Sequence, residues 1–450
     1  MTPSIPTSKR HRLLNIIVVV FVAGAVMLSY YSLLAPPLSV RRESWNVTKC
    51  ELPTECEEAS VMSVTQNYST HFRRRLETKH VDCGRVLRSD EEYIRTITAR
   101  RPKLRPSQRR LNCNYIRRSV IGQKNYTPLP FGVAYARIVY ESYDFIEDEL
   151  TASYHPQNVF CYSVDKKAPD SFNLRIKFLS RCFSNVLVTQ ARFPVNSAGR
   201  YQNHAHHECL KLLINVPGWE YVILMQNYDV IIRSVYETIS IFQALNGSND
   251  ISVVGCDPRR LDHSAAWDIR SLKLLPNEYN ASAVQNKTLR FKCGSVQASL
   301  SHSAVSWMVR TANLTTLLDQ LNTDRYGVDE ILLATLKVNA ELGMPGKFAS
   351  SCSKRNQPGK ETPYFTRKNF RFTRWQSRDS CPTKRFRHSI CIFGIEDLPI
   401  LSQRHELLAN KILPYFDYAV VDCLHELIFN RTHLGQSDHE LDWKRYWRKC

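Results

Sequence analysis

The stretch Val159-Phe-Cys-Tyr-Ser-Val-Asp165 is a short apolar run, rich in β-branched and aromatic residues, that ends in a carboxylate. Similar runs recur along the chain, at Val133–Val139, Val186–Thr189, Tyr221–Met225, Ile251–Val254 and Ala304–Val309. Helical apolar patterns lie between several of these runs, at Ala205–Ile214, Val235–Leu245, Leu314–Leu321 and Glu330–Val338. Because strands that alternate with helices build a sheet covered on both faces, the pattern predicts an α/β fold.

The composition is that of a globular protein with a basic surface. Hydrophobic residues make up 43% of the 450, which is enough to bury a sizeable core. Lys and Arg number 61 against 42 Asp and Glu, so the net charge is +19. This excess would suit nucleic acid, a membrane surface or an acidic ligand, and composition alone does not choose among them.

The amino terminus carries a long uncharged segment. No charged residue lies between Leu13 and Val40, and about 20 apolar residues cross a hydrocarbon layer of ~30 Å. The apolar part of a secretory signal peptide is shorter, at about 7–15 residues. Lys9, Arg10 and Arg12 precede the segment, which favours a cytosolic amino terminus. We therefore predict a single-span type II protein whose remaining residues lie in an oxidising lumen.

Two further features agree with a lumenal location. The 14 cysteines include no C-x-x-C pair, which suits disulfides better than zinc ribbons. N-glycosylation sequons occur at Asn46, Asn67, Asn125, Asn246, Asn280, Asn286, Asn313 and Asn430. This topology excludes nucleic acid as a partner. The basic runs that follow the predicted span, such as Arg73-Arg74-Arg75, are interpreted as a solvated face.

Ligands of open α/β sheets bind beyond the carboxyl ends of the strands. The polar stretches there are Ser163–Lys167 and Gln226–Asp229. The chain has neither a G-x-G-x-x-G nor a P-loop motif, so dinucleotide and P-loop functions are excluded. A metal-like cluster within His204–Cys209 has no partner group at zinc spacing. We interpret it as a helix start with exposed histidines.

An anchor, a polar stem and an α/β head together suggest a transferase that uses sugar nucleotides. Metal-dependent members of that class usually carry an Asp-x-Asp motif, and the chain contains none. Either the chain is not such an enzyme, or positive side chains replace the metal.

Four ordered stretches resemble the core-2/I-branching β-1,6-N-acetylglucosaminyltransferases (glycosyltransferase family 14). They are Tyr154–Ala168, Asp329–Thr335, Ser389–Leu398 and the segment from His405-Glu-Leu-Leu-Ala-Asn-Lys411 through Cys423. The resemblance runs from about Cys83 to Cys423, and Asp257–Cys293 matches poorly. It implies a GT-A-type fold with a mixed, mostly parallel sheet, UDP-N-acetylglucosamine as the donor, inversion at the anomeric carbon, and no metal or other cofactor.

Glu330 matches the family's catalytic base. In a single in-line displacement a carboxylate takes the proton of the acceptor hydroxyl as its oxygen attacks. Glu330 also begins a predicted helical run, and a helix N-terminus favours the ionised carboxylate.

The resemblance also implies residues that bind the donor and the acceptor. Lys411 matches one basic residue of the diphosphate site, where fixed cations stabilise the leaving group. The family has an arginine where this chain has His388, so either Arg387 takes over or His388 acts in its protonated form. Asp165 matches a residue that contacts the nucleoside. Trp375 matches an acceptor-side aromatic, although the tyrosine expected two residues later is Ser377.

The resemblance implies the disulfides Cys83–Cys423, Cys113–Cys182, Cys161–Cys209 and Cys381–Cys391. We add Cys256–Cys293, and leave Cys50, Cys56, Cys352 and Cys450 unassigned. Cys50 or Cys56 could link two chains into a disulfide-bonded homodimer.

The sequence thus predicts a Golgi membrane enzyme that adds N-acetylglucosamine in β-1,6 linkage to an O-glycan or glycoprotein acceptor. The alternatives are a peptide O-xylosyltransferase-like enzyme that uses UDP-xylose, and an inactive membrane-tethered carbohydrate-binding protein. The predicted segments are a cytosolic tail (1–12), a transmembrane signal anchor (13–35), a lumenal stem (36–125), a catalytic domain (126–435) and a C-terminal tail (436–450).

Overall fold

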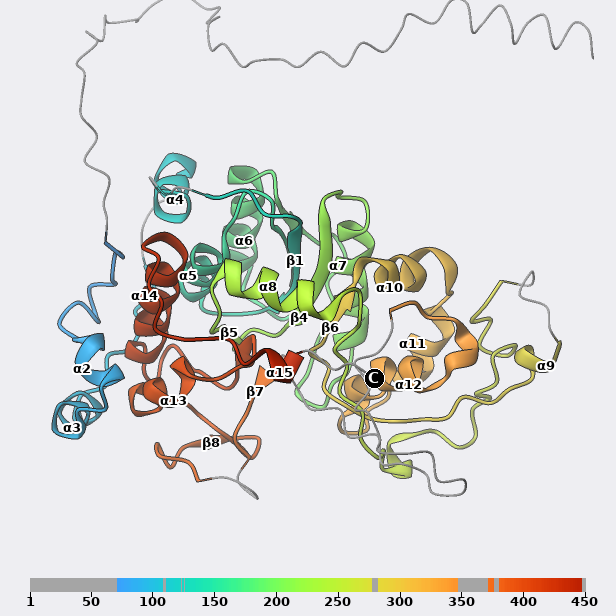
Figure 1. Cartoon of the computed structure of the whole chain (residues 1–450). Helices are drawn as coiled ribbons and strands as arrows, with labels where there is room; N and C mark the ends of the chain where they lie inside the picture. Colours follow the sequence, from blue (N-terminus) through green and yellow to red (C-terminus); the bar gives the residue numbers. More distant parts are fainter. Residues whose placement is uncertain are drawn as a thin grey trace, which may run out of the picture. The chain divides into compact units, whose positions relative to one another are not determined.

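A five-stranded sheet with the strand order β3-β2-β1-β4-β6 organises the fold. Its strands are β1 (Gly132–Val139), β2 (Val159–Val164), β3 (Val186–Val188), β4 (Trp219–Met225) and β6 (Ser299–Ser301). Of these, β1, β4 and β6 are labelled in Figure 1. The first four pair in parallel, and β6 runs antiparallel to β4. Every residue of β1 and β2 is buried, as expected for parallel strands covered on both faces. The predicted mixed, mostly parallel α/β sheet is confirmed.

This computed structural model describes residues 71–107, 111–122, 124, 126–276, 282–346, 371–375 and 380–446. All of them belong to one unit, Asn67–Cys450. Among these residues no helix is both long enough and apolar enough to cross a membrane. The predicted anchor at 13–35 lies outside the described residues.

Successive residues of a strand point to opposite faces of the sheet, so apolar strands place apolar side chains on both faces. Helices cover both of these faces. Tyr135 and Phe160 point into the larger core, whereas Ala136 and Cys161 point into the second core. The larger core is built with α2 (Cys83–Leu87), α3 (Glu91–Ala99), α4 (Cys113–Val120), α5 (Tyr143–Ser153), α6 (Asp170–Cys182), α8 (Val235–Leu245), α13 (Leu398–Ser402), α14 (Ala419–His433) and α15 (Trp443–Tyr446). The second core is built with α7 (Gln202–Leu213), α10 (His302–Ser306), the π-helix η2 (Trp307–Thr311), α11 (Thr315–Leu321) and α12 (Leu332–Val338).

Smaller elements complete the described chain. A three-stranded sheet has the order β5 (Val230–Ile231), β10 (Leu408–Ala409) and β7 (Arg371–Phe372), and β8 (Phe386–Arg387) pairs with β9 (Ile390–Cys391). The remaining short helices are η1 (Pro258–Arg260), α9 (Ser282–Gln285), η3 (Val328–Glu330), η4 (Ala340–Leu342) and η5 (Ile395–Asp397).

Two of the predicted strands are wrong. Ile251–Val254 forms no named strand, and an isolated bridge joins Val254 to Cys293. Ala304–Val309 is helical, because the Ser301 side chain accepts a hydrogen bond from Ala304 N and caps α10. Short apolar runs do not distinguish a buried helix from a buried strand.

Part of the predicted stem packs against the larger core. Cys83 and Val86 of α2, Ile97 of α3 and Ile116 of α4 are buried there. Residues 36–70 lie outside the described residues, so the limits of the stem and of the catalytic domain stay predictions.

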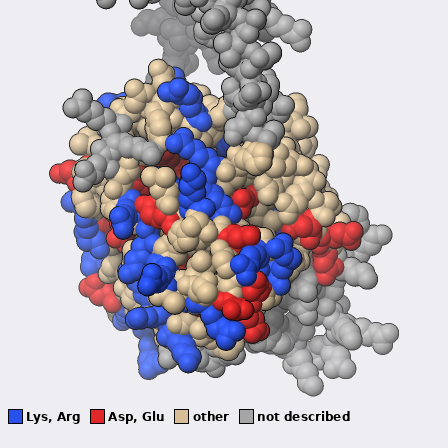
Figure 2. All heavy atoms as spheres, turned by 90° about the vertical axis from the view of Figure 1, so that its left-hand side faces the viewer, with Lys and Arg blue, Asp and Glu red and all other residues tan. Residues whose placement is uncertain are grey.

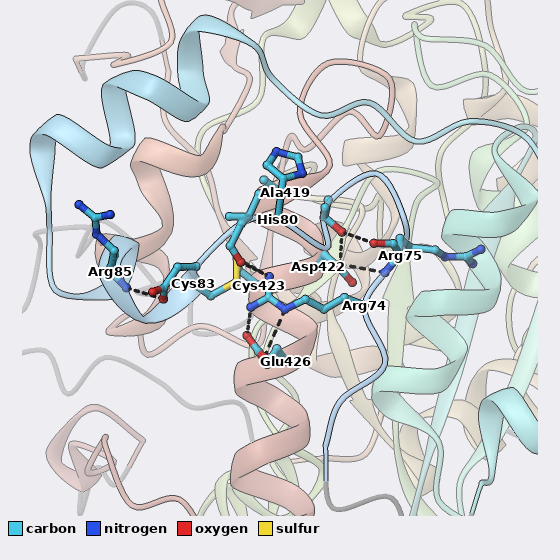
Figure 3. The surroundings of a disulfide bond; sticks show 12 residues. Arg74, Arg75, His80, Cys83, Arg85, Ala419, Asp422, Cys423 and Glu426 are labelled. Carbon is cyan, nitrogen blue, oxygen red and sulfur yellow. Dashed lines mark hydrogen bonds and ion pairs between the residues drawn. A yellow bond between two sulfur atoms is a disulfide. The ribbon is translucent and has the colours of Figure 1, made fainter.

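The basic run Arg73-Arg74-Arg75 is not a fully solvated face. Arg74 is ion-paired with Glu426 (Figure 3). It also donates from Nη1 to Val81 O at 2.7 Å. Arg75 pairs with Asp148 at 2.6 Å. The side of the molecule that carries α2, α3 and α14 still shows many Lys and Arg side chains, with Asp and Glu among them (Figure 2).

Four sequon asparagines lie within the described residues. Asn246, Asn286 and Asn313 are exposed, and Asn430 is half-buried. The other four, Asn46, Asn67, Asn125 and Asn280, lie outside the described residues.

Candidate active site

A cavity of about 640 Å³ opens beyond the carboxyl ends of β1, β2 and β4. Tyr140 follows β1, Asp165 follows β2 and Gln226 follows β4, and all three line the cavity. The structure brings every residue for which the sequence predicted a catalytic or substrate-binding role to this one cavity: Asp165, Glu330, Trp375, Arg387, His388 and Lys411. Glu330 and Lys411, which are 81 positions apart, therefore share a site. The chemical roles of these residues stay predictions.

The acidic wall of the cavity is formed by Asp329 and Glu330. Glu330 ends the 3₁₀ turn η3, and α12 begins two residues later, so Glu330 precedes the predicted helix rather than standing in its first turn. Its backbone carbonyl accepts a hydrogen bond from Gly294 N at 2.8 Å. Its side chain is 37% exposed, and Oε2 accepts from Arg260 Nη1 at 2.7 Å. The sequence analysis did not single out Arg260, which lies in the poorly matched segment.

Asp329 is buried beside Glu330. Burial, followed by the negative charge of Glu330, raises the pKa of Asp329 to about 7. The backbone of Gly199, at φ +97°, passes so close that a Cβ there would lie 2.0 Å from Asp329 Oδ1. Only glycine fits both this conformation and this contact.

The basic wall comes from the carboxyl-terminal part of the chain. Burial, followed by the charges of Arg387 and Arg371, lowers the pKa of Lys411 to about 8. No residue that the structure describes forms an ion pair with Lys411. Arg371 Nη1 lies 3.7 Å from Asp229 Oδ1, and its side chain is 11% exposed. Arg371 belongs to none of the four motifs, so its place in the cavity could not be predicted from them.

Arg387 ends β8, and His388 follows it in the turn that leads to β9. His388 and Ser389 both have positive φ, 52° and 59°, as the two central residues of a type I′ turn require. Histidine adopts this conformation more often than most side chains do. Arg387 Nη1 donates to Tyr415 Oη at 3.0 Å, and its guanidinium lies 5.3 Å from the centre of the Tyr228 ring.

His388 is exposed on the hairpin, and partial desolvation, followed by the charges of Lys411 and Arg387, lowers its pKa. This direction is opposite to the one that a protonated His388 requires. The choice between Arg387 and His388 at the diphosphate stays a prediction.

Asp165 and Trp375 complete the set of predicted substrate-binding residues. Asp165 is buried, and its Oδ1 accepts from Lys167 N at 2.8 Å. Burial raises the pKa of Asp165. Trp375 is half-buried and forms an isolated antiparallel bridge with Ile390. Ser377 lies outside the described residues.

Three glutamine side chains that line the cavity are linked by hydrogen bonds; they are Gln202, Gln226 and Gln297. Gln226 donates from Nε2 to Gln202, and its Oε1 accepts from Gln297 Nε2 at 2.7 Å. Gln297 Nε2 also lies 3.3 Å from Asp229 Oδ2. The sequence analysis singled out Gln226–Asp229 from its place after a strand, but nothing local marked Gln202 or Gln297.

The histidine cluster does not match its predicted description. His206 is buried and donates from Nε2 to Met225 O at 3.0 Å. His204 and His207 are half-buried, so the prediction of exposed histidines is wrong. His204 lies 3.0 Å from Asp319 Oδ1. Cys209 is bonded to Cys161. Within the described ranges no group of three or more His, Cys, Asp or Glu side chains is arranged to hold a metal ion.

Disulfides tie together elements that are distant in the sequence. The structure joins the pairs that the resemblance implies, together with the pair that we added; they are Cys83–Cys423, Cys113–Cys182, Cys161–Cys209, Cys381–Cys391 and Cys256–Cys293. Cys50, Cys56, Cys352 and Cys450 lie outside the described residues. A link between two chains through Cys50 or Cys56 thus stays a prediction.

Comparison with known proteins gives the class of this site. The family model for "Branch: Core-2/I-Branching enzyme" matches residues 133–402, more than half of the chain. The sequence is 26% identical over 326 residues to beta-1,3-galactosyl-O-glycosyl-glycoprotein beta-1,6-N-acetylglucosaminyltransferase 3 of Ovis aries, covering 68% of this chain and 70% of that protein. The Homo sapiens protein of the same name is 27% identical over 319 residues, with the same coverage.

A viral protein is similar over a longer span. The beta-1,3-galactosyl-O-glycosyl-glycoprotein beta-1,6-N-acetylglucosaminyltransferase of Bovine herpesvirus 4 is 26% identical over 385 residues, covering 79% of this chain and 84% of that protein. Among solved structures, S. aureus TarS 1-349 covers 43% of this chain and 56% of its own, with 14% identity and a TM-score of 0.23, which is too low to carry an argument.

The cavity is therefore the candidate active site of a glycosyltransferase. More particularly, the chain belongs to the Core-2/I-branching enzyme family.

Proposed function

We propose that the chain transfers N-acetylglucosamine from UDP-N-acetylglucosamine to a glycan hydroxyl, with inversion, in a GT-A-type domain. The observation that carries this proposal is that Glu330 and Lys411 line one cavity. The names of the relatives support the sugar and the β-1,6 linkage. They also support a β-1,3-galactosyl O-glycan as the acceptor.

Glu330 is the proposed general base. A carboxylate within hydrogen-bond reach of the acceptor hydroxyl takes its proton as the oxygen attacks the anomeric carbon, a contribution of about 10²–10⁴-fold. Glu330 is partly exposed on the cavity wall, so a substrate hydroxyl has access to it. The guanidinium of Arg260 donates to Glu330 Oε2 at 2.7 Å and holds the carboxylate in place.

The leaving group is a diphosphate whose negative charge grows as the glycosidic bond breaks. Arg371, Arg387 and Lys411 place three cationic side chains on one side of the cavity. Preorganised charges of this kind stabilise a developing anion without reorganisation. We propose that they do so without a divalent ion, that Asp165 contacts the nucleoside, and that Trp375 lies under an acceptor sugar.

The location follows from the sequence. We propose that the chain is a single-pass type II protein of the Golgi membrane with its catalytic domain in the lumen. The five described disulfides, together with the sequons whose asparagines are exposed, support an oxidising, glycosylating compartment.

The test uses the purified full chain with UDP-N-acetylglucosamine or UDP-xylose, and β-1,3-galactosyl O-glycan or peptide acceptors, with and without EDTA. We expect β-1,6-linked N-acetylglucosamine in both conditions.

Glu330→Gln should lower kcat at least about 100-fold and leave UDP binding intact, whereas Glu220→Gln, at an exposed position of β4, should change neither. Wild-type turnover in Glu330→Gln would refute the base, and loss of activity in EDTA would refute the metal-free mechanism. Transfer from UDP-xylose alone would favour the peptide O-xylosyltransferase-like enzyme. Transfer from neither donor would favour the inactive carbohydrate-binding protein.

A further inference from the structure

The floor of the cavity holds buried amides whose hydrogen bonding is incomplete. Asn227, Gln297 and Asn410, here called the amide floor, are 1%, 1% and 2% exposed and line the cavity. Asn227 Nδ2, Gln297 Oε1 and Asn410 Oδ1 have no hydrogen-bond partner among the residues that the structure describes. The hydroxyl of Tyr228, which also lines the cavity, has none in the same set.

The first two amides are oriented by the bonds that they do make. Asn227 Oδ1 accepts from Tyr140 N at 2.8 Å, so its Nδ2 is the end left for a ligand. Gln297 Nε2 donates to Gln226 Oε1 at 2.7 Å, so its Oε1 is the end left. One amide therefore offers a donor and the other an acceptor.

Asn410 is oriented by a hydrogen bond, and Tyr228 is oriented by the packing of its ring. Asn410 Nδ2 donates to Tyr228 O at 3.4 Å, which leaves Oδ1 as an acceptor. The Tyr228 ring is packed edge-on against Tyr140 at 5.7 Å and lies under the guanidinium of Arg387. Its hydroxyl both donates and accepts.

This combination indicates the chemistry of the ligand. A buried polar group without a partner costs about 1–3 kcal/mol, so a set of them in one cavity favours a ligand that satisfies them together. A diphosphate offers only acceptors, and an apolar ligand offers neither kind of group. Sugar hydroxyls donate and accept at once, and an acetamido group adds one donor and one acceptor.

The amide floor is connected to both charged walls and lines the same cavity. The segment that carries Gln297 is joined to the acidic wall, because Gly294 N donates to Glu330 O at 2.8 Å. Asn410 directly precedes Lys411 of the basic wall. A UDP-sugar with its diphosphate on the cations and its anomeric carbon toward the base would have its sugar ring in the cavity that these amides line.

We propose that the amide floor and the Tyr228 hydroxyl bind the hydroxyl and acetamido groups of the transferred sugar and determine which UDP-sugar the enzyme uses. This inference rests on the proposed UDP-sugar transferase function. It assigns specificity to residues outside the four family motifs, apart from Asn410, which lies in the last of them.

The experiment compares the sugar-bearing donor with UDP alone in the purified full chain. Tyr228→Phe removes the free hydroxyl and keeps the ring. Asn227→Asp keeps the oxygen that Tyr140 N binds and replaces the free donor with an acceptor. Asn114→Asp, at an exposed position of α4, is the matched control. The measurements are the Kd of UDP and kcat/KM with UDP-N-acetylglucosamine and with UDP-xylose.

We expect kcat/KM with UDP-N-acetylglucosamine to fall about tenfold in Tyr228→Phe and about 100-fold in Asn227→Asp. The Kd of UDP should stay within about twofold, because UDP lacks the transferred sugar whose groups the amide floor is proposed to bind. The preference for N-acetylglucosamine over xylose should shrink, since xylose lacks the acetamido and hydroxymethyl groups. A variant that only disturbed folding would lower both donors alike, so this ratio separates the two causes.

Other results overturn the assignment. If the wild type is active and both variants keep its donor preference, the amide floor does not bind the sugar, although the proposed function stands. If the wild type transfers sugar from neither donor, the proposed function fails and the floor assignment fails with it. If Asn227→Asp does not fold, as shown by its melting curve, the donor preference of Tyr228→Phe decides.

Discussion

Arg260 Nη1 lies 2.7 Å from Glu330 Oε2, so the proposed base is already held by a guanidinium from a segment 70 positions away. The same nitrogen lies 3.4 Å from Gly327 O, at the start of the turn that carries Glu330. Gly327 has φ +77°, and a Cβ there would lie 2.6 Å from Arg260 Nη1. The guanidinium thus occupies space that only a glycine leaves open.

Removal of this guanidinium should slow turnover. In Arg260→Met the carboxylate loses the partner that fixes its position, and we expect kcat to fall about tenfold while the Kd of UDP is unchanged. Arg259→Met is the control, because Arg259 is 91% exposed and, among the residues that the structure describes, pairs only with Asp257. Steady-state kinetics of the two variants decide the matter, and equal kcat values would contradict the positioning role.

The affinity for UDP should depend on pH through Lys411. The pKa of Lys411 is lowered to about 8 by burial, so its charge is lost as the pH rises through that value. Above pH 8 the Kd of UDP should therefore rise, approaching tenfold per pH unit. Lys411→Arg stays charged and should bind UDP without this rise. Lys177→Arg, at an exposed position of α6, should keep the rise in Kd. Calorimetric titrations with UDP from pH 6 to about 10 measure the Kd, and a wild-type Kd that stays constant above pH 8 would contradict the role of Lys411.

Gly199 and Gly218 offer a matched pair of alanine substitutions. Both have a positive φ, +97° and +93°, but a Cβ at Gly199 would meet Asp329 Oδ1 at 2.0 Å, whereas nothing lies within 4 Å of one at Gly218. Both variants carry the backbone strain of about 1–2 kcal/mol. We expect only Gly199→Ala to displace Asp329–Glu330 and to lose most of its transferase activity. Similar activities, measured at matched folded fractions, would show that the contact is unimportant.

The disulfides should differ in their contribution to stability. Cys83–Cys423 closes a loop with a sequence separation of 340, against 10 for Cys381–Cys391. In the chain-entropy model the longer loop contributes about 6 kcal/mol and the shorter about 3 kcal/mol. Serine replacement of both cysteines of each pair, followed by chemical unfolding, measures the difference. A larger loss for the short loop would argue against this model.

The central strands could be predicted because they are buried on both faces. Val133–Val139 and Val159–Val164 are continuous apolar runs, and both are strands. The bounds of α8 also match the predicted Val235–Leu245, since Ser234 and Glu237 form a capping box at its start. The run Ala304–Val309 was misread, because its apolar residues fill the second core as a helix rather than as a strand.

The candidate site could be predicted where the resemblance reached and where polar residues follow a strand. Asp165, Glu330 and Lys411 lie in matched motifs, Gln226 follows a strand, and all four line the cavity. Gln297 lines the cavity and Arg260 binds Glu330, but both come from segments with no local signal of function. A lone arginine or glutamine in a sequence is more often a surface residue, so only the structure singles out these two.

The Cys83–Cys423 bond has a consequence for a cleaved chain. It joins α2 to α14 across most of the sequence, and the Arg74–Glu426 pair lies beside it (Figure 3). A protease that cuts the backbone once, anywhere between these cysteines, yields two fragments that remain covalently attached. Such a nicked protein would migrate as one band on a non-reducing gel and as two bands after reduction.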